Sequence, residues 1–221
     1  MTLAERLEAL RSRIARACAE AGRDPSGVEL LPVSKRQPLP LIQEAAALGF
    51  HRFGENYVQE GAAKAEAAPG LAFVLIGPLQ RNKAKAALQA FREILSLDRP
   101  DLADRLRRLA EELDVVRPVW LQVDLWNEAT KLGGCAEADL PALLDALGGD
   151  ARLPLEGLMA IPPPGEATAF RQLAGLRDRL QQELGRPLRL SMGMSADLEA
   201  AIAAGSDQIR IGTAFFGERA S

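Results

Sequence analysis

The chain has 221 residues, 48% of them hydrophobic and 26% charged, and a formal net charge of −3. This length allows one large domain or two small ones, and the mild acidity argues against a nucleic-acid partner, which would favour a basic stripe. No apolar run is long enough to cross a bilayer, and a single histidine, His51, excludes a multi-histidine metal site. Cys18 and Cys135 lack metal or redox spacing, which favours free thiols. We therefore expect a cytoplasmic protein with neither a membrane nor a nucleic-acid partner.

The first 22 residues place leucines and an isoleucine at helical spacing and include acids, which predicts a packing helix and not a secretory signal. After this helix, eight short apolar runs alternate with helical stretches. The expected strands are 28–35, 51–56, 72–79, 93–98, 117–125, 153–162, 187–195 and 207–215. The expected helices between them are 38–49, 57–68, 81–91, 100–114, 136–149, 168–185 and 195–205.

Strict alternation of strands and helices predicts parallel strands joined by crossover helices. Eight such strands favour an α/β fold of the closed (β/α)8 barrel type with an extra N-terminal helix, although an open doubly wound sheet fits the same pattern. The proline cluster "IPPPGE" (161–166) falls where a strand-to-helix loop belongs, so it marks no linker. We expect residues 1–221 to form a single domain.

The stretch "LLPVSKRQP" (30–38) places Lys35 at the end of an apolar run, just before a chain turn. In parallel α/β folds, functional side chains gather at the carboxyl ends of the strands. Alternation puts Lys35 on the same face as Leu31 and Val33. If this face points into the barrel, partial desolvation increases the neutral, nucleophilic fraction of the amine, as a Schiff-base lysine requires. A lysine that extends to solvent from the rim of the barrel is the alternative.

The last expected strand contains "DQIRIGT" (207–213), which places Arg210 and Gly212 on one face and two isoleucines on the other. An arginine inside a barrel is costly unless it meets an anion or an acceptor. Gly212 allows close approach to backbone amides, Thr213 adds a hydroxyl, and barrels commonly bind phosphate after the seventh and eighth strands. We therefore expect Gly212 and Thr213 to hold a phosphate.

The seventh expected strand ends in "RLSMGMS" (189–195), where Ser191, Gly193 and Ser195 share a face and lead into a helix. Amides at a helix N-terminus attract an anion. We expect Ser191 to bind the same phosphate. Ser195 fits two roles, a phosphate ligand or the N-cap of the following helix.

These residues form a set of one amine, a phosphate cradle and an arginine between them. Pyridoxal phosphate (PLP) needs this combination, because the amine forms an imine with its aldehyde, the cradle holds its phosphate, and a side chain contacts its ring nitrogen. A Schiff-base aldolase that acts on a phosphorylated sugar uses the same groups without a cofactor, and it stays open as an alternative.

Several motifs carry a resemblance to a known family: "VSK" (33–35), "FGENYVQE" (53–60), "IGPLQRNK" (76–83), "GLMAIPP" (157–163) and "LSMGMSADLEAAIAAGSDQIRIGTAFFG" (190–217). From about Leu31 to Gly217, the chain resembles the pyridoxal phosphate homeostasis proteins, which are similar to the barrel of alanine racemase. The last motif is long and specific, whereas "GLMAIPP" alone is weak.

The resemblance implies a protein that binds PLP covalently, as an aldimine, and buffers it or delivers it to PLP-dependent apoenzymes. The residues that it implies at the cofactor are Lys35 at the aldehyde, Asn56 and Met159 at the ring, Arg210 at the pyridine nitrogen, Ser191, Gly212 and Thr213 at the phosphate, and Met192 and Ser195 close by. Pro78 departs from the family pattern, in which a histidine is usual, and so does the segment 124–134, where an asparagine and smaller residues are commoner. These departures leave partner contacts at the two loops open.

A low-activity amino-acid racemase is the alternative within this fold. Racemisation needs acid–base groups on both faces of the bound imine, and the racemase relatives bring a tyrosine from a second domain. The only tyrosine here, Tyr57, lies beside the second expected strand, and His51 lies at the far end of that strand from Asn56. An arginine at the ring nitrogen also makes the ring a weaker electron sink, which disfavours transaminase-type chemistry. We therefore expect a monomeric carrier that is not an enzyme.

Overall fold

The computed structural model describes residues 1–126, 133–163 and 167–217. Within these residues, eight strands run parallel in one sheet, in the order β1-β8-β7-β6-β5-β4-β3-β2. The strands are β1 Glu29–Pro32, β2 Arg52–Glu55, β3 Ala72–Leu75, β4 Glu93–Leu97, β5 Val119–Gln122, β6 Leu155–Met159, β7 Arg189–Ser191 and β8 Gln208–Ile211. All eight expected strands are therefore present, each shorter than expected.

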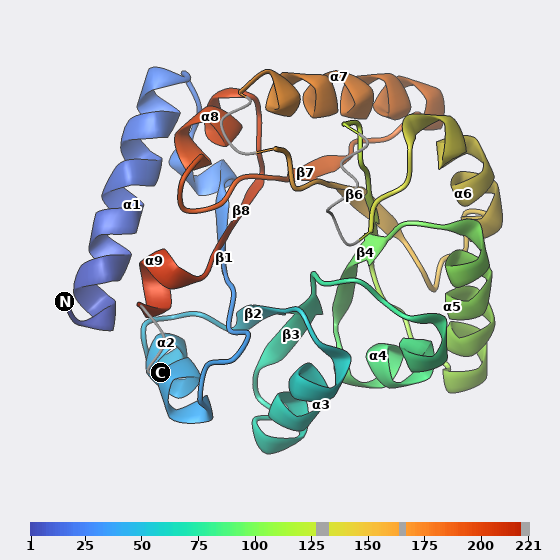
Figure 1. The fold of residues 1–221 in the computed structure, drawn as a ribbon, viewed down its shortest axis with the longest axis horizontal. Coiled ribbons are helices and arrows are strands. Elements are labelled where there is room, and N and C mark those ends of the chain that lie inside the picture. Colours follow the sequence, from blue (N-terminus) through green and yellow to red (C-terminus); the bar gives the residue numbers. More distant parts are fainter. Residues whose placement is uncertain (127–132, 164–166, 218–221) are drawn as a thin grey trace.

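The two strands at the ends of this order, β1 and β2, also meet. Val33 forms a parallel bridge with Gly54, and the Ser34 N–H donates to the Gly54 carbonyl at 2.9 Å. The sheet therefore closes on itself as a barrel surrounded by helices (Figure 1). This confirms the (β/α)8 barrel and rejects the open sheet.

Helices follow the strands around the outside of the barrel (Figure 1). They are α1 Leu3–Glu20, α2 Leu39–Ala47, α3 Val58–Ala67, α4 Ala84–Ala90, α5 Pro100–Leu113, α6 Leu140–Leu147, α7 Ala167–Leu184, α8 Leu198–Ala203 and α9 Thr213–Phe216. The extra N-terminal helix α1 begins with a capping box between Thr2 and Glu5, and it packs against α8 and α9. None of the helices in the described ranges is long and apolar enough to cross a membrane.

Buried side chains form two clusters. The smaller cluster lies inside the barrel and consists of Leu31, Val74, Leu95, Trp120 and Met159. The larger one fills the layer between strands and helices and includes Ile209 and Ile211 of β8. Alternation along β1 and β8 therefore works as expected: Leu31 points inward, whereas the isoleucines that flank Arg210 point outward.

The eighth strand is shorter than the sequence indicated, because the chain turns at Gly212 into the short helix α9. The N–H groups of Phe215 and Phe216 both donate to the Gly212 carbonyl, each at 3.0 Å. The Phe215 ring packs edge-on against Phe50, with ring centroids 5.1 Å apart. Burial of these two rings favours a helical turn over a continued strand at this position.

The amino-terminal end of the barrel is closed by charged side chains. Arg52 donates to Glu29 at 2.7 Å and also to Glu93, and the Trp120 indole N–H donates to Glu93 at 2.6 Å. Burial raises the pKa of the Glu93 carboxyl, and the positive charge of Arg52 opposes that shift. This end of the barrel interior is thus filled by an ion network, which leaves the carboxyl end for function.

Candidate functional site

Lys35 lies in a turn just past the carboxyl end of β1. The strand ends at Pro32 and the bridge at Val33 extends the pairing, after which Lys35 and Arg36 form the turn. Arg36 has a φ of 59°, in the left-handed region that residues other than glycine rarely adopt. The Lys35 side chain is half-buried at this end of the barrel.

A cluster of ions lies directly beside this turn. The Lys64 ammonium, from α3, donates to the Ser34 carbonyl at 2.7 Å, to Glu55 at 2.6 Å and to Glu60 at 2.8 Å. The Ser34 hydroxyl donates to the same Glu55 oxygen at 2.6 Å, and the Arg36 N–H donates to Glu60. Burial raises the pKa of the Glu55 carboxyl, and the hydrogen bonds from Lys64 and Ser34 oppose that shift.

Arg210 is buried inside the barrel, as alternation predicted. Its Nη1 donates to the carbonyl and hydroxyl of Ser191 at 2.7 and 2.9 Å, and its Nη2 donates to the Ala160 carbonyl at 2.8 Å. Burial lowers the pKa of the guanidinium to about 10, opposed by the charge of Asp197, so Arg210 stays charged at neutral pH. These three bonds leave part of its five donors for a ligand.

Arg210 and Lys35 come to the same end of the barrel from neighbouring strands. Arg210 stands opposite Leu31 in the pairing of β8 with β1. Its guanidinium, however, bonds to Ser191 and Ala160, which lie at the carboxyl ends of β7 and β6. The turn that carries Lys35 also lies past the carboxyl end of β1. The Lys35 amine and the Arg210 guanidinium therefore lie at the same end of the barrel, which we call the mouth.

The Ser191 hydroxyl is fully engaged within the protein. It accepts from Arg210, and it donates to Gln208 Oε1 at 2.8 Å. Gln208 Nε2 in turn donates to Glu29 at 3.0 Å. A guanidinium only donates and a carboxylate only accepts, so the direction of every bond in this chain is fixed. Ser191 therefore holds Arg210 through its hydroxyl oxygen, while its proton is bound to Gln208.

Asn56, at the carboxyl end of β2, offers an unused acceptor. Its Oδ1 is buried and has no hydrogen-bond partner among the atoms of the described residues. Gly77 packs against the Asn56 backbone so closely that a Cβ there would lie 2.2 Å from the Asn56 carbonyl oxygen. Buried acceptors without a partner are uncommon and costly, so Asn56 is suited to a donor on a bound molecule.

The two methionines of the prediction lie in different layers. Met159 is buried in the interior cluster together with Leu31 and Trp120. Met192 belongs to the layer between strands and helices, so its side chain does not share the barrel interior with Met159.

Residues 195–197 do not form the helix start that the sequence indicated, because α8 begins at Leu198. The N-cap of α8 is Asp197, and its carboxylate accepts from the Met194 N–H at 2.6 Å. Ser195 lies two residues earlier in a turn, half-buried, and its carbonyl accepts from Arg13 of α1 at 3.0 Å. Gly193 has a φ of 92°, and a Cβ on it would lie 2.4 Å from the Ala201 side chain. The N-cap role expected for Ser195 is therefore wrong.

Gly212 is the N-cap of α9 and Thr213 its first residue, next to the turn that carries Lys35. A Cβ on Gly212 would lie 3.7 Å from Val33, in ordinary contact distance. The side chain of Thr213 is exposed at this rim.

Tyr57 and His51 lie beyond opposite ends of β2. Tyr57 is 47% exposed, and its ring lies under the Arg36 guanidinium, 5.9 Å from the ring centroid. His51 precedes β2 at the amino-terminal end and is exposed, opposite to Asn56, as expected.

Sequence reasoning missed four polar residues that support the site: Glu55, Glu60, Lys64 and Gln208. Glu60 and Lys64 are spaced i,i+4 within helix α3, a pattern typical of an ordinary surface ion pair. Their role could have been inferred from the position of α3, which follows the second strand. In a closed barrel this strand is the neighbour of the strand that leads to Lys35. Pro78 is exposed after β3, and most of the divergent segment 124–134 lies outside the described residues.

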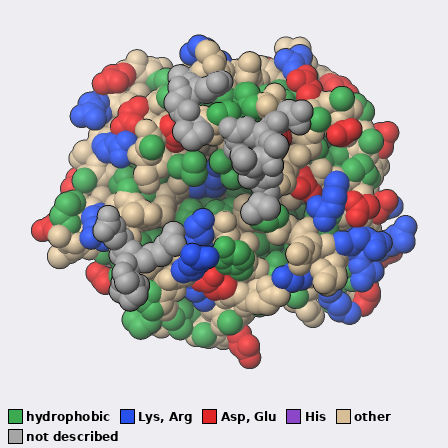
Figure 2. All heavy atoms as spheres, viewed as in Figure 1, with side chains coloured by type: hydrophobic (Ala, Val, Ile, Leu, Met, Phe, Trp, Pro, Cys, Tyr) green, Lys and Arg blue, Asp and Glu red, His purple; other side chains and the backbone are tan. Residues whose placement is uncertain are grey.

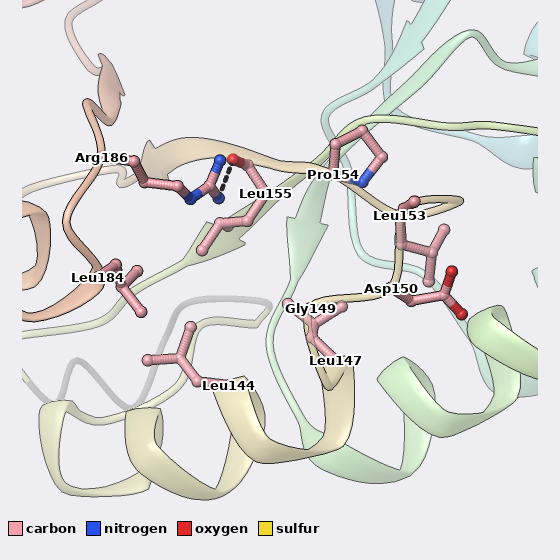
Figure 3. A pocket seen from close by; sticks show the side chains of 10 residues that line it. Leu144, Leu147, Gly149, Asp150, Leu153, Pro154, Leu155, Leu184 and Arg186 are labelled. Atoms are coloured by element: carbon pink, nitrogen blue, oxygen red, sulfur yellow. Dashed lines mark hydrogen bonds between the residues drawn. The ribbon is translucent and has the colours of Figure 1, made fainter.

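A separate cavity lies at the other end of the barrel (Figure 3). It has a volume of about 410 Å³ and is lined by the ends of α6 and α7, the start of β6 and the loop between α6 and β6. Arg186 crosses it to donate to the Leu155 carbonyl. Leu155 is the first residue of β6, so this cavity is remote from Lys35. In the described part of the chain, no cluster of His, Cys, Asp or Glu is arranged to hold a metal ion.

The carboxyl end therefore combines a half-buried amine, a buried guanidinium with spare donors and a buried unpaired amide oxygen. Figure 2 shows Lys or Arg atoms lying deep near the centre of one face, between hydrophobic atoms. Such a site suits a small aromatic anion that carries a carbonyl: the cations attract its charge, the apolar walls cover its ring and the amine captures its carbonyl carbon.

Comparison with known proteins agrees with this geometry. Residues 6–220 match the family of the alanine racemase N-terminal domain. The pyridoxal phosphate homeostasis protein of Pseudomonas aeruginosa is 45% identical over 226 residues, covering 99% of this chain and 96% of the relative. That of Escherichia coli K12 is 40% identical over 229 residues, covering 98% and 97%.

Solved structures show the same relationship. PipY of Synechococcus elongatus PCC7942, solved with PLP bound, superposes with a TM-score of 0.86 at 39% identity, covering 98% of this chain and all of that one. An alanine racemase of Clostridium difficile shares the fold at 12% identity, with a TM-score of 0.72, and this chain covers 59% of it. The motifs, the closed barrel and these relatives together place the chain in the pyridoxal phosphate homeostasis protein family, whose barrel is that of the alanine racemase N-terminal domain.

Proposed function

We propose that this protein binds PLP at the carboxyl end of its barrel, attaches it covalently to Lys35 and serves in PLP homeostasis, with residues 1–221 acting as one binding domain. The observation that carries the proposal is the pairing of β1 with β8. It brings the Lys35 turn and the buried Arg210 guanidinium to one mouth. The solved PipY complex with PLP and the names of the curated relatives support it.

The described residues fit this cofactor. The Lys35 amine would attack the aldehyde carbon, and water would leave as the C=N bond forms. Asn56 Oδ1, buried without a partner, would accept from a ring hydroxyl, and Met159 would pack against the ring from the interior cluster. Arg210 would donate to the pyridine nitrogen with donors that Ser191 and Ala160 leave unused.

The phosphate would bind where β7 and β8 lead into their loops, at the backbone of Gly212, at Thr213 and at Ser195. Ser191 was expected to bind phosphate directly. Its proton points to Gln208, so we assign it the support of Arg210. Met192 would stabilise the same region from the outer layer.

PLP supplies an aldehyde that amines capture reversibly and a ring that can withdraw electrons. A charged Arg210 beside the ring nitrogen keeps a proton off that nitrogen, which weakens the ring as an electron sink. Racemisation also needs a second acid–base group, whereas Tyr57 is 47% exposed and its ring lies under the Arg36 guanidinium. We therefore propose a carrier, working in the cytoplasm as a monomer, from which PLP-dependent apoenzymes withdraw the cofactor; a weak racemase is the alternative.

Absorption spectroscopy and peptide mapping test the proposal together. We expect purified protein mixed with PLP to show a visible imine band that the Lys35→Ala variant lacks. Borohydride reduction followed by mass mapping should place the pyridoxyl group on the peptide with Lys35. Modification confined to another peptide would refute the site, and sustained amino-acid racemisation that Lys35→Ala abolishes would favour the enzyme over the carrier.

A further inference from the structure

A buried ion cluster, formed by Glu55, Glu60 and Lys64, stands between helix α3 and the turn that carries Lys35. The Lys64 and Glu55 side chains are only 11% and 0% exposed. Desolvating such ions costs as much as their attraction returns unless the geometry is excellent, so a buried ion pair is weak evidence for a stabilising role. A role at the neighbouring turn accounts for this cluster better.

The cluster holds the backbone on both sides of Lys35. On one side, the Ser34 carbonyl accepts from Lys64 at 2.7 Å, and the Ser34 hydroxyl donates to Glu55. On the other side, the Arg36 N–H donates to Glu60. The left-handed conformation of Arg36 is unfavourable for an L-residue, so the turn needs such contacts to persist.

Lys64 itself is unsuited to carry a carbonyl ligand. An ammonium has three N–H donors, and Lys64 uses all of them, on Ser34, Glu55 and Glu60. Lys35, in contrast, makes no hydrogen bond or ion pair with any part of the chain that the structure describes. The Lys64 ammonium is therefore held by three protein acceptors, whereas the Lys35 amine is available to a ligand.

We propose that Lys64, together with Glu55 and Glu60, is a positioning residue that fixes the direction in which the turn presents the Lys35 amine. The cluster acts on the attack of the amine and not on the capture of the phosphate, which the residues after β7 and β8 would hold, or of the ring nitrogen, which Arg210 would contact. This inference rests on the proposed function, since it concerns the same lysine.

Two ligands distinguish the attack of the Lys35 amine on the aldehyde from non-covalent binding of the ligand. PLP reports imine formation by its absorbance in a stopped-flow instrument. Pyridoxine 5′-phosphate carries an alcohol in place of the aldehyde, so it reports binding without a covalent bond. In Lys64→Met we expect the rate constant of imine formation to fall at least about tenfold, because misplacement by about 1 Å is enough to slow a reaction strongly. The Kd of pyridoxine 5′-phosphate should stay within about twofold of the wild-type value.

Matched variants exclude a general loss of stability. Leu143→Ala opens a cavity under α6, on the other side of the barrel, and we expect it to lower the melting temperature without slowing imine formation. Lys64→Arg keeps a charged donor and should recover part of the rate. Glu60→Ala removes the acceptor of the Arg36 N–H at a half-buried helical position, and should also slow the reaction if Lys64→Met does not fold.

The outcomes are distinct. An imine rate in Lys64→Met and Glu60→Ala equal to that of the wild type would overturn the positioning role, and so would a slowing that Leu143→Ala reproduces. Absence of any imine at Lys35 in the wild type would instead refute the proposed function itself.

Discussion

At the scale of single residues, the proposed site contains a charge that is costly to bury, the Arg210 guanidinium. Arg210 lies inside the barrel with three hydrogen bonds to protein acceptors and no carboxylate among them. Burial lowers the pKa of its guanidinium, which shows that the folded protein bears part of the desolvation cost. In the proposed complex, PLP would use the remaining donors of this buried cation.

Replacement of Arg210 should therefore separate binding from stability. We expect Arg210→Met to raise the Kd of pyridoxine 5′-phosphate by about tenfold or more, since a hydrogen bond to a charged donor is worth about 1.5–3 kcal/mol. The unfolding free energy should change little, because removal of a buried charge offsets the loss of its three hydrogen bonds to Ser191 and Ala160. Isothermal titration and urea unfolding measure the two effects. A variant that binds normally but unfolds easily would show that Arg210 is structural.

At the scale of elements, the alternation along strands β1 and β8 could be read from the sequence, and so the inward positions of Leu31 and Arg210 were predictable. The end of β8 and the start of α8 could not be predicted from the sequence. The turn at Gly212 depends on the packing of Phe215 against Phe50. The N-cap position of α8 is Asp197 and not Ser195. The contacts of Lys64 could not be predicted from the sequence either, since its partners come from different elements.

Loss of the same cluster should also affect folding. We expect Lys64→Met to lower the unfolding free energy by about 3 kcal/mol, because it leaves the buried Glu55 carboxylate without its cation. Urea denaturation at pH 7 measures this. The Lys85→Met variant breaks an exposed pair with Glu112 and should differ from the wild type by less than about 1 kcal/mol. Equal effects of the two variants would contradict the structural reading of the cluster.

The ion network at the amino-terminal end predicts a pH dependence. Burial raises the pKa of Glu93 in the folded state, so above the ordinary pKa of a glutamate the folded protein binds more protons than the unfolded chain, and its stability falls as pH rises through that range. Glu93→Gln removes this contribution. We expect the unfolding free energy of the variant, relative to that of the wild type, to increase as the pH rises above the ordinary pKa of a glutamate. A relative loss for the variant over the same range would contradict the assignment.

At the scale of the whole molecule, the N-terminal helix is linked to the proposed phosphate site. Arg13 of α1 donates to the Ser195 carbonyl and forms two hydrogen bonds with Glu199 at 2.8 and 2.9 Å. The pair is one-third exposed, so its loss should cost no more than about 1 kcal/mol of stability. The sequence predicted this helix but not its contact, because the two segments lie more than 180 residues apart in the chain.

This link leads to a prediction about affinity. Arg13→Met should release the segment that carries Ser195 and raise the Kd of pyridoxine 5′-phosphate by about two- to fivefold, the equivalent of up to about 1 kcal/mol. Arg107→Met, which removes an exposed pair with Asp104 on α5, is the matched control and should bind normally. Unchanged affinity in Arg13→Met would separate α1 from the site.

The central claim is that an amine from the first strand and a guanidinium from the eighth meet one ligand at the carboxyl mouth of the barrel. A crystal structure of the protein grown with PLP tests it most directly. The account predicts electron density that continues from Lys35 Nζ into the ligand, with the ring nitrogen within hydrogen-bonding distance of Arg210 and the phosphate beside Gly212 and Thr213. A ligand bound elsewhere, or held at the mouth without contact to either Lys35 or Arg210, would contradict it.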